Sequence, residues 1–180
     1  PIRFLIAECE KPITVLSALY LAHKLDIADH LDISPLFETD YGIESGGEII
    51  KTLLQMPVYQ SYLKSRGRMA IQIGFSDSGR FVGQIAAAVS IEKLQISIIG
   101  ALNETFGSSI DLIIFNTHGE SKGRGGNPDS PEKRQGFILT PHVRAMCLDM
   151  GVRVFHQSSF QGGDGYRFFK NQKIAWQSLR

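Results

Sequence analysis

Residues 110–116, which read IDLIIFN, carry the clearest sign of the fold class. Their apolar side chains form a nearly continuous run, interrupted only by Asp111 before the closing Asn116. A strand of a parallel sheet is covered on both faces and has this pattern, whereas a strand with one solvent face alternates between apolar and polar residues. The stretch therefore predicts a buried parallel strand.

Strand-like and helix-like patterns alternate on both sides of this stretch. Short apolar runs predict four further strands, at residues 2–8, 32–38, 69–75 and 152–156. Helical patterns lie between or beside them, at residues 13–24, 47–64, 82–106 and 141–150, and Pro57 should kink or break the second of these. Such alternation predicts an α/β protein whose parallel strands are joined by right-handed crossovers.

Two architectures fit this order, a doubly wound sheet and part of a (β/α)8 barrel. A full barrel takes about 250 residues, so five strands within 180 residues fit a partial TIM-type barrel with long helices. No repeat or linker is visible, and residues 119–136 form the only long polar loop. The chain opens on Pro1, and no clear stop precedes its end at Arg180. We therefore expect residues 1–180 to be a single partial catalytic barrel domain, cut from a longer chain.

Charge and cysteine content argue against several classes of protein. The formal net charge is +1, which gives no field for gathering nucleic acid or an anionic membrane. Cys9 and Cys147 lie far apart and in no CxxC pair, so we expect small core residues in a reducing, cytoplasmic compartment. No signal peptide is visible, and the longest apolar stretch, residues 85–89, is shorter than the roughly 20 residues of a membrane span.

Polar residues gather where the predicted strands end. Glu38 ends the second strand, Asp77 follows the third between two serines, His118 follows the fourth, and the fifth runs into His156. In α/β folds the carboxyl ends of the strands form the rim of the active site. Four successive strands that deliver polar groups to one rim indicate an enzyme.

Glu38 and Asp77 are carboxylates at the ends of neighbouring predicted strands. Two carboxylates with open coordination positions suit Mg²⁺ or Mn²⁺, which take oxygen ligands and keep water. Spacing alone leaves another interpretation open, in which each carboxylate caps a helix or pairs with an arginine.

The segment Lys122–Gly126, which reads KGRGG, suits an anion, because glycines let backbone N–H groups approach it and Arg124 adds a planar fork. A solvated surface loop is the plainer interpretation, and an arginine-glycine segment also occurs in RNA-binding proteins. His118 is either a ligand or orienting group, or simply a histidine hydrogen-bonded at the end of its strand.

Taken together, these motifs resemble the phosphoenolpyruvate carboxylase family. The resemblance covers most of residues 4–126 and rests on FLIAECEKPITVLSALYLAHKLDI, DISPLFET, IQIGFSDSGR and FNTHGESKGRGG. It implies a lyase that adds bicarbonate to phosphoenolpyruvate, giving oxaloacetate and phosphate, as in carbon fixation and the supply of the tricarboxylic acid cycle. It further implies Mg²⁺ or Mn²⁺, a barrel fold, a cytoplasmic location and a homotetramer in full-length form, with no nucleic-acid or membrane partner.

The resemblance also assigns roles to individual residues. Glu38 and Asp77 match the metal ligands of the family. The remaining matches are catalytic Arg124, His118 and Arg80, the last of these standing where the family has lysine, and substrate-binding Arg124, Lys122, Gly125 and Gly126.

The chain departs from the family pattern in three places. Its glycine loop is two residues shorter, with Glu120 where the first arginine is expected, and residues 80–83 read RFVG in place of KDAG. A TAHPT histidine motif is absent from these residues, so we expect the 180-residue piece alone to be inactive. An alternative is a paralogue that binds phosphoenolpyruvate or a related anion without carboxylating it. A third hypothesis is an RNA-binding or scaffolding role for the loop, which the charge balance disfavours.

Overall fold

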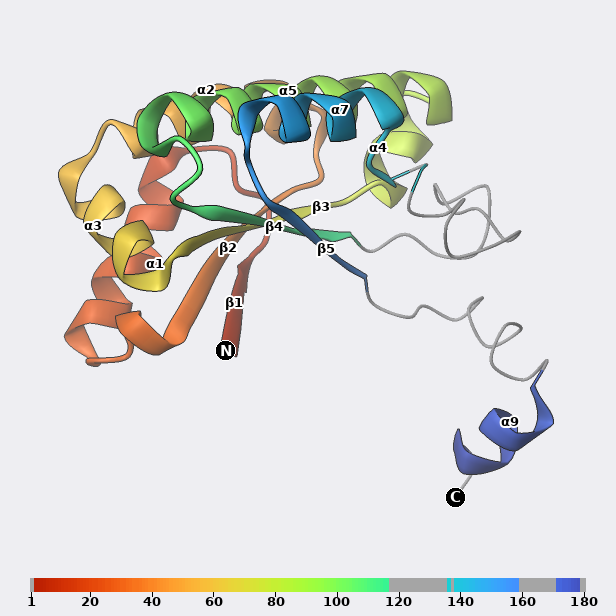
Figure 1. Ribbon diagram of the computed structural model, residues 1–180, viewed down its shortest axis with the longest axis horizontal. Coiled ribbons are helices and arrows are strands. Elements are labelled where there is room, and N and C mark those ends of the chain that lie inside the picture. The colour runs from red at the N-terminus through yellow and green to blue at the C-terminus, as the bar shows by residue number, and fades with distance from the viewer. Residues whose placement is uncertain (1, 117–135, 137, 159–170, 179–180) are drawn as a thin grey trace.

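The computed structural model describes residues 2–116, 136, 138–158 and 171–178 (Figure 1). Five strands form one sheet: β1 (Ile2–Ile6), β2 (Leu31–Phe37), β3 (Arg68–Ile73), β4 (Asp111–Asn116) and β5 (Val154–Ser158). The helices are α1 (Pro12–Lys24), a 3₁₀ turn η1 (Ala28–His30), α2 (Asp40–Leu54), α3 (Pro57–Arg66), α4 (Ser76–Phe81), α5 (Gln84–Phe106), α7 (Pro141–Met150) and α9 (Gln172–Ser178).

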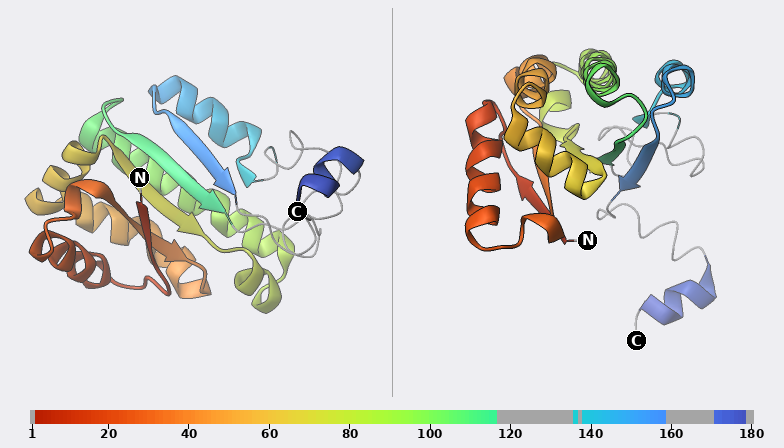
Figure 2. Two further views of the ribbon diagram at one scale, coloured as in Figure 1. Left: turned by 90° about the horizontal axis from the view of Figure 1, so that it is seen from below. Right: turned by 60° about the vertical axis from the view of Figure 1, so that its left-hand side comes forward.

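The sheet is wholly parallel, and its spatial order β1-β2-β3-β4-β5 follows the chain. A doubly wound sheet reverses its strand order at a switch point, and these five strands contain no such reversal. Successive right-handed crossovers in one direction place every connecting helix on the same face. Figure 2 shows α1, α2, α5 and α7 in an arc along one face of a curved sheet. The predicted parallel α/β architecture is confirmed.

The core lies between this helical arc and the sheet. Alternate strand residues face the helices and are fully buried, for instance Met69 and Ile71 on β3 beside Leu112 and Ile114 on β4. Both free cysteines are buried members of the core cluster, as their interpretation as small core residues predicts. Burial raises the pKa of the Cys9 thiol to about 11, so that side chain stays protonated at neutral pH.

Helix α2 begins at Asp40, seven residues before the predicted start at residue 47. Thr39 caps it, since its Oγ1 accepts a hydrogen bond from the N–H of Gly42 at 3.0 Å. Glycine lowers helix propensity, so the sequence pattern did not indicate the first half of α2. Here the glycines permit close packing, because a Cβ on Gly47 would lie 2.3 Å from Oγ of Ser97 on α5.

Two other helix boundaries have local causes, one of them predicted and one not. Pro57 does break the helix predicted at residues 47–64, and it opens α3 at a position where its missing N–H costs nothing. Residues 76–81 form α4, which the sequence pattern did not indicate. Gly83, at φ 87°, separates α4 from α5 in a conformation that other residues rarely adopt.

The sheet face turned away from the helices carries a charged network near the amino-terminal ends of the strands. Asp32 on β2 is buried and accepts hydrogen bonds from Arg66 and Arg68 at 2.6–3.0 Å. On the next strands, Nε of Arg153 donates to Oδ1 of Asp111 at 2.7 Å. The two arginines around Asp32 pair a buried charge that would otherwise be costly.

Arg3 reaches across this same face from one edge of the sheet to the other. Its guanidinium donates a hydrogen bond to Oε1 of Gln157 on β5 and lies 4.9 Å from the ring centroid of Phe115 on β4. The two edge strands of a flat five-stranded sheet are roughly 19 Å apart. The side chains of Arg3 and Gln157 are too short to meet across that distance. They meet because the sheet is strongly curved, which brings its two edge strands closer together.

Helix α5 is long enough and apolar enough on average to cross a membrane, by length and composition only. The sequence pattern had not indicated such a helix, because the longest unbroken apolar stretch in it is only residues 85–89. Within the described residues α5 packs along α2 and the sheet, and the side chains it buries include Leu94, Ile98 and Leu102.

Candidate active site

Glu38 directly follows β2 and points to the face opposite the helices. Phe37 is fully buried in the core, and successive side chains of a strand alternate between faces. Gly74 lies beside Glu38 at the end of β3, where its N–H donates to the carbonyl of Phe37 at 2.9 Å. A Cβ at position 74 would lie 2.7 Å from Cβ of Glu38. Position 74 must therefore be glycine for Glu38 to keep its place.

Glu8, an acidic residue after β1, also contributes to the site, and no motif in the sequence pointed to it. Its backbone N–H hydrogen bonds to the carboxylate of Glu38. Glu8 has φ 48°, in the left-handed region that non-glycine residues seldom occupy. Backbone strain of this kind persists where the surrounding structure fixes it and is frequent at functional sites.

The Glu38 carboxyl is electrostatically coupled to Asp77. Burial is the largest influence on it and raises its pKa above the usual range, while the Glu8 N–H opposes that shift. The charges of Asp77 and Glu8 raise the pKa of Glu38 further. The rim of β1, β2 and β3 thus concentrates negative charge, and a cation there would relieve the repulsion.

Asp77 lies in the first turn of α4, just beyond β3. Its Oδ1 accepts a hydrogen bond from Nη2 of Arg80 at 2.6 Å, and Nε of Arg80 donates to the carbonyl of Ser76 at 3.0 Å. Pairing with an arginine was the alternative that spacing left open, and the structure shows that pair for Asp77. Arg80 is therefore linked to the candidate site by its contact with Asp77.

The residues present fit a hard divalent cation. Glu38 and Asp77 offer carboxylate oxygens, the charges of Asp77 and Glu8 both act on Glu38, and Gly74 leaves the space beside Glu38 free of a side chain. Among the described residues no group of three or more His, Cys, Asp or Glu side chains is arranged to hold a metal. A two-carboxylate donor set leaves coordination positions for water and substrate oxygens, as Mg²⁺ prefers.

The remaining predicted site residues lie outside the described residues, namely His118, Lys122, Arg124, Gly125 and Gly126. His156 is described, and its placement at the rim was wrong. It lies inside β5 in register with Ile114 and Ile71, two core residues that face the helices. Burial, with the charge of Arg144 adding to it, lowers the pKa of His156 to about 4.

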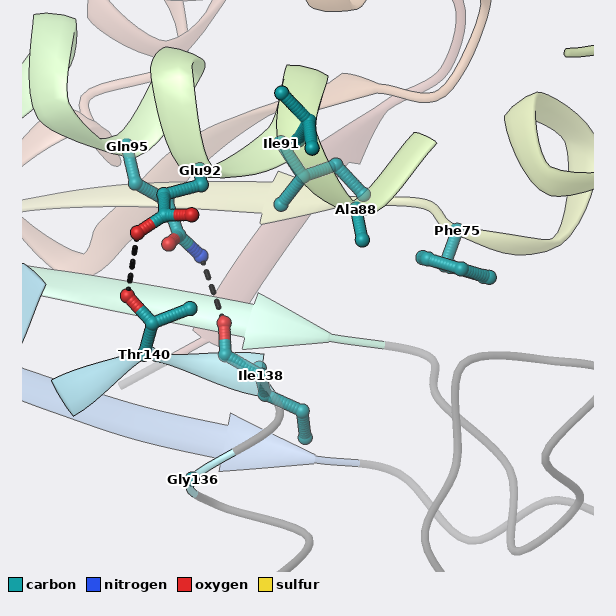
Figure 3. A pocket seen from close by; sticks show the side chains of 9 residues that line it. Phe75, Ala88, Ile91, Glu92, Gln95, Gly136, Ile138 and Thr140 are labelled. Atoms are coloured by element: carbon teal, nitrogen blue, oxygen red, sulfur yellow. Dashed lines mark hydrogen bonds between the residues drawn. The ribbon is translucent and has the colours of Figure 1, made fainter. Parts of the chain in front are cut away.

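A small pocket lies between α5 and the segment before α7 (Figure 3). It has a volume of about 200 Å³, and Phe75, two residues before Asp77, lines it. Nε2 of Gln95 donates to the carbonyl of Ile138 at 3.0 Å, and Oγ1 of Thr140 donates to Glu92 at 2.7 Å. These bonds tie the segment before α7 to α5. Neither Glu38 nor Asp77 lines this pocket.

Comparison with known proteins gives the family of this chain. The family described as "Phosphoenolpyruvate carboxylase" matches residues 2–131, more than half of the chain. The chain belongs to the phosphoenolpyruvate carboxylase family.

Individual relatives carry the same family name. A phosphoenolpyruvate carboxylase of Shewanella oneidensis is 31% identical over 177 residues, 98% of this chain and 18% of that protein. One of Hahella chejuensis is 30% identical over 125 residues, covering 69% of this chain and 14% of that protein. "Phosphoenolpyruvate carboxylase 4" of Arabidopsis thaliana is 36% identical over 100 residues, covering 54% and 9%. The chain thus spans less than a fifth of the length of these relatives.

Proposed function

We propose that the full-length protein is a divalent-metal-dependent phosphoenolpyruvate carboxylase and that this chain is its carboxyl-terminal catalytic portion, with a divergent glycine loop. The observation that carries the proposal is the placement of Glu38 and Asp77 just beyond the carboxyl ends of two adjacent parallel strands, within a chain of this family. The reaction would add bicarbonate to phosphoenolpyruvate and release oxaloacetate and phosphate.

We further propose that the sheet is five strands of a (β/α)8 barrel formed with other parts of the polypeptide. The sequential strand order and the single helical face support this. So does the contact between Arg3 and Gln157. Arg3 pairs with Asp32, and Arg68 pairs with Asp111. Extending the β2–β3 and β4–β5 registers to the same level joins Asp32 to Arg68 and Asp111 to Arg153, and Gln157 lies four residues beyond Arg153.

The displacement from Arg153 to Gln157 agrees in size with the stagger expected for such a barrel. In an eight-stranded barrel with a shear of about 8, the residue at a given height along the barrel axis is displaced from the hydrogen-bonded register by about one position for each strand crossed. Four strands away, the side chain level with Arg3 should be displaced by about four residues, as Gln157 is. Leu5 and Phe155, both exposed on this face, would then face the barrel interior.

In this account Glu38 and Asp77 hold the cation, which when bound stabilises the negative charge that develops on enolate and phosphoryl oxygens. The Glu8 N–H orients the Glu38 carboxylate, and Gly74 leaves room for it. Arg124, with Lys122, Gly125 and Gly126, would bind the anionic substrate, and His118 would assist. The assignments in the loop rest on the family resemblance alone.

The expectations about the whole protein also remain proposals. Its substrates would be phosphoenolpyruvate and bicarbonate, its assembly a homotetramer, and its location the cytoplasm. A 180-residue piece would be inactive by itself, since five strands cannot close an eight-stranded barrel. Its sheet would leave two edges and apolar side chains such as Leu5 and Phe155 uncovered.

A non-carboxylating paralogue is the second candidate, and Glu120 favours it. An acidic residue stands where the family motif has an arginine, so the loop has lost one group that binds substrate anions. Such a protein would still bind phosphoenolpyruvate or a related anion at the acidic rim and its cation.

Oxaloacetate formation by the full-length protein distinguishes the two candidates. The assay contains phosphoenolpyruvate, bicarbonate and Mg²⁺, and equilibrium binding of phosphoenolpyruvate is measured in parallel. Turnover that depends on bicarbonate and stops on chelation supports the carboxylase. Binding without turnover supports the paralogue, and Glu120→Arg should then restore measurable turnover if that charge is what was lost.

A further inference from the structure

Arg80 folds back over the first turn of α4 and holds two of its oxygens. Nη2 contacts Oδ1 of Asp77 at 2.6 Å, and Nε donates to the carbonyl of Ser76 at 3.0 Å. The pair is accessible to solvent, with the Arg80 and Asp77 side chains 70% and 42% exposed. An oxygen assigned to the cation therefore already has a positively charged partner supplied by the chain itself.

We propose that Arg80 competes with the divalent cation for Asp77 and so sets the metal affinity of the site. This inference rests on the proposed function, because it assumes that Asp77 is a metal ligand. A guanidinium and a divalent cation repel one another when they share one carboxylate oxygen. The guanidinium yields, since an exposed ion pair of this kind is weak and water can solvate the released side chain.

The identity of the residue matters as well as its charge. The two contacts of Arg80 use Nε and Nη2, which are fixed relative to one another in a planar group. A lysine, which the family motif has at this place, carries a single ammonium and does not reproduce both bonds. Lysine would hold Asp77 less firmly, so a chain with arginine here should need a higher metal concentration than one with lysine.

The chain offers a matched control on α2. Lys51 pairs with Glu48 at 2.7 Å, three residues apart and exposed, as Arg80 and Asp77 are. Lys51→Gln removes one positive charge from a similar pair that has no part in the proposed site. It therefore separates competition at Asp77 from a general change in net charge.

The test is a titration of the full-length protein with Mn²⁺ alone, with free Mn²⁺ followed by electron paramagnetic resonance. The variants are Arg80→Gln, Arg80→Lys, Lys51→Gln and Asp77→Asn. We expect Arg80→Gln to bind Mn²⁺ about twofold to fivefold more tightly than the parent, the size expected from losing an exposed pair. The Mn²⁺ affinity of Arg80→Lys should lie between that of the parent and that of Arg80→Gln. Lys51→Gln should bind Mn²⁺ as the parent does, and Asp77→Asn should bind it far more weakly.

The variants also separate failure of this inference from failure of the metal assignment. If Asp77→Asn weakens Mn²⁺ binding while Arg80→Gln and Arg80→Lys bind no more tightly than the parent, the site stands and the competition is refuted. If Asp77→Asn binds Mn²⁺ as the parent does, the metal assignment fails and the competition falls with it. An equal gain in Lys51→Gln would mean that net charge alone controls the affinity, which also refutes the role of Arg80.

Discussion

Arg3 on β1 donates a hydrogen bond to the side-chain amide oxygen of Gln157 on β5, although these are the two edge strands of the sheet. The contact crosses the sheet face that carries Asp32 and Arg68. On the same face, the Arg3 guanidinium lies against the ring of Phe115. The sheet is thus curved toward a cylinder, with its helices outside. This curvature turns the carboxyl ends of β2 and β3, where Glu38 and Asp77 lie, toward a common rim.

The curvature predicts a cross-link between the edge strands. In the full-length protein, Arg3→Cys with Gln157→Cys should be joined by a short bis-maleimide, because their side chains meet across the concave face. Phe4→Cys with Val154→Cys is the control, since strand alternation places both on the opposite face. Peptide mass spectrometry identifies the products. Equal yields from the two pairs would argue for a flat sheet.

Asp32 should matter more for stability than its single charge suggests. Burial alone would raise its pKa, but hydrogen bonds from Arg68 and Arg66 outweigh burial, and the pKa is lowered. Asp32→Asn leaves two arginines without their carboxylate, at a cost of about 3 kcal/mol. Hydrogen exchange of peptides from β2 and β3 should speed up accordingly. Glu48→Gln, in an exposed pair, should change exchange little.

The direction of the Asp32 pKa shift determines the pH range over which Asp32 stabilises the fold. Because the folded-state pKa is depressed, the stabilisation is complete above the ordinary aspartate pKa of about 4 and is lost as the pH falls through the lower folded value. The difference in exchange between the parent and Asp32→Asn should shrink in that acidic range. A difference that grows on acidification would contradict the network.

His156 predicts a second pH dependence in a higher window. Its pKa is lowered to about 4 in the fold, against about 6.5 when unfolded. The fold therefore prefers the neutral ring, and stability is complete above about pH 6.5 and falls by on the order of 2–3 kcal/mol as the pH drops to 4.

The amide of Asn116 contacts Nε2 of His156, which accepts this bond only while the ring is neutral. His156→Gln should make the exchange rate of β4 and β5 peptides nearly independent of pH between about 6.5 and 4, once intrinsic exchange is corrected for. An unchanged pH dependence in this variant would mean that another group titrates.

Gly74 should be needed for the site more than for the fold. Gly74→Ala places a Cβ 2.7 Å from Cβ of Glu38, and such overpacking costs about 1–3 kcal/mol. Glu38 must move, so Mn²⁺ binding should weaken as well. Gly100→Ala on α5 is the control, because a Cβ there meets nothing within 4 Å and helix propensity should favour it by about 0.5–1 kcal/mol. Unaltered Mn²⁺ binding in Gly74→Ala would separate Glu38 from the metal.

Regular elements were the part of the fold most accessible from sequence. Helix α7 begins and ends where the pattern placed it, because Pro141 opens it and Gly151, at φ 68°, closes it. The start of α2 was missed because its glycines oppose helix formation locally, whereas two of them, Gly46 and Gly47, allow close packing against α5.

Within the site, strand ends located Glu38 and Asp77, but two contacts could not be inferred from the chain. The bond from the Glu8 N–H to Glu38 joins the segments that follow β1 and β2. The placement of His156 among core residues depends on the register of β5 with β4. Both are tertiary features, and local sequence preferences carry no information about them.

The central claim is that Glu38 and Asp77 hold the divalent cation for carboxylation, and Glu38→Gln tests it most directly. Oxaloacetate formation is measured in the full-length protein as a function of Mg²⁺, with Glu48→Gln as the control. We predict a loss of turnover of at least about 100-fold in Glu38→Gln, because a ligand to the charge-stabilising cation is gone, and near-parent turnover in Glu48→Gln. Parent-like turnover and Mg²⁺ dependence in Glu38→Gln would contradict the account.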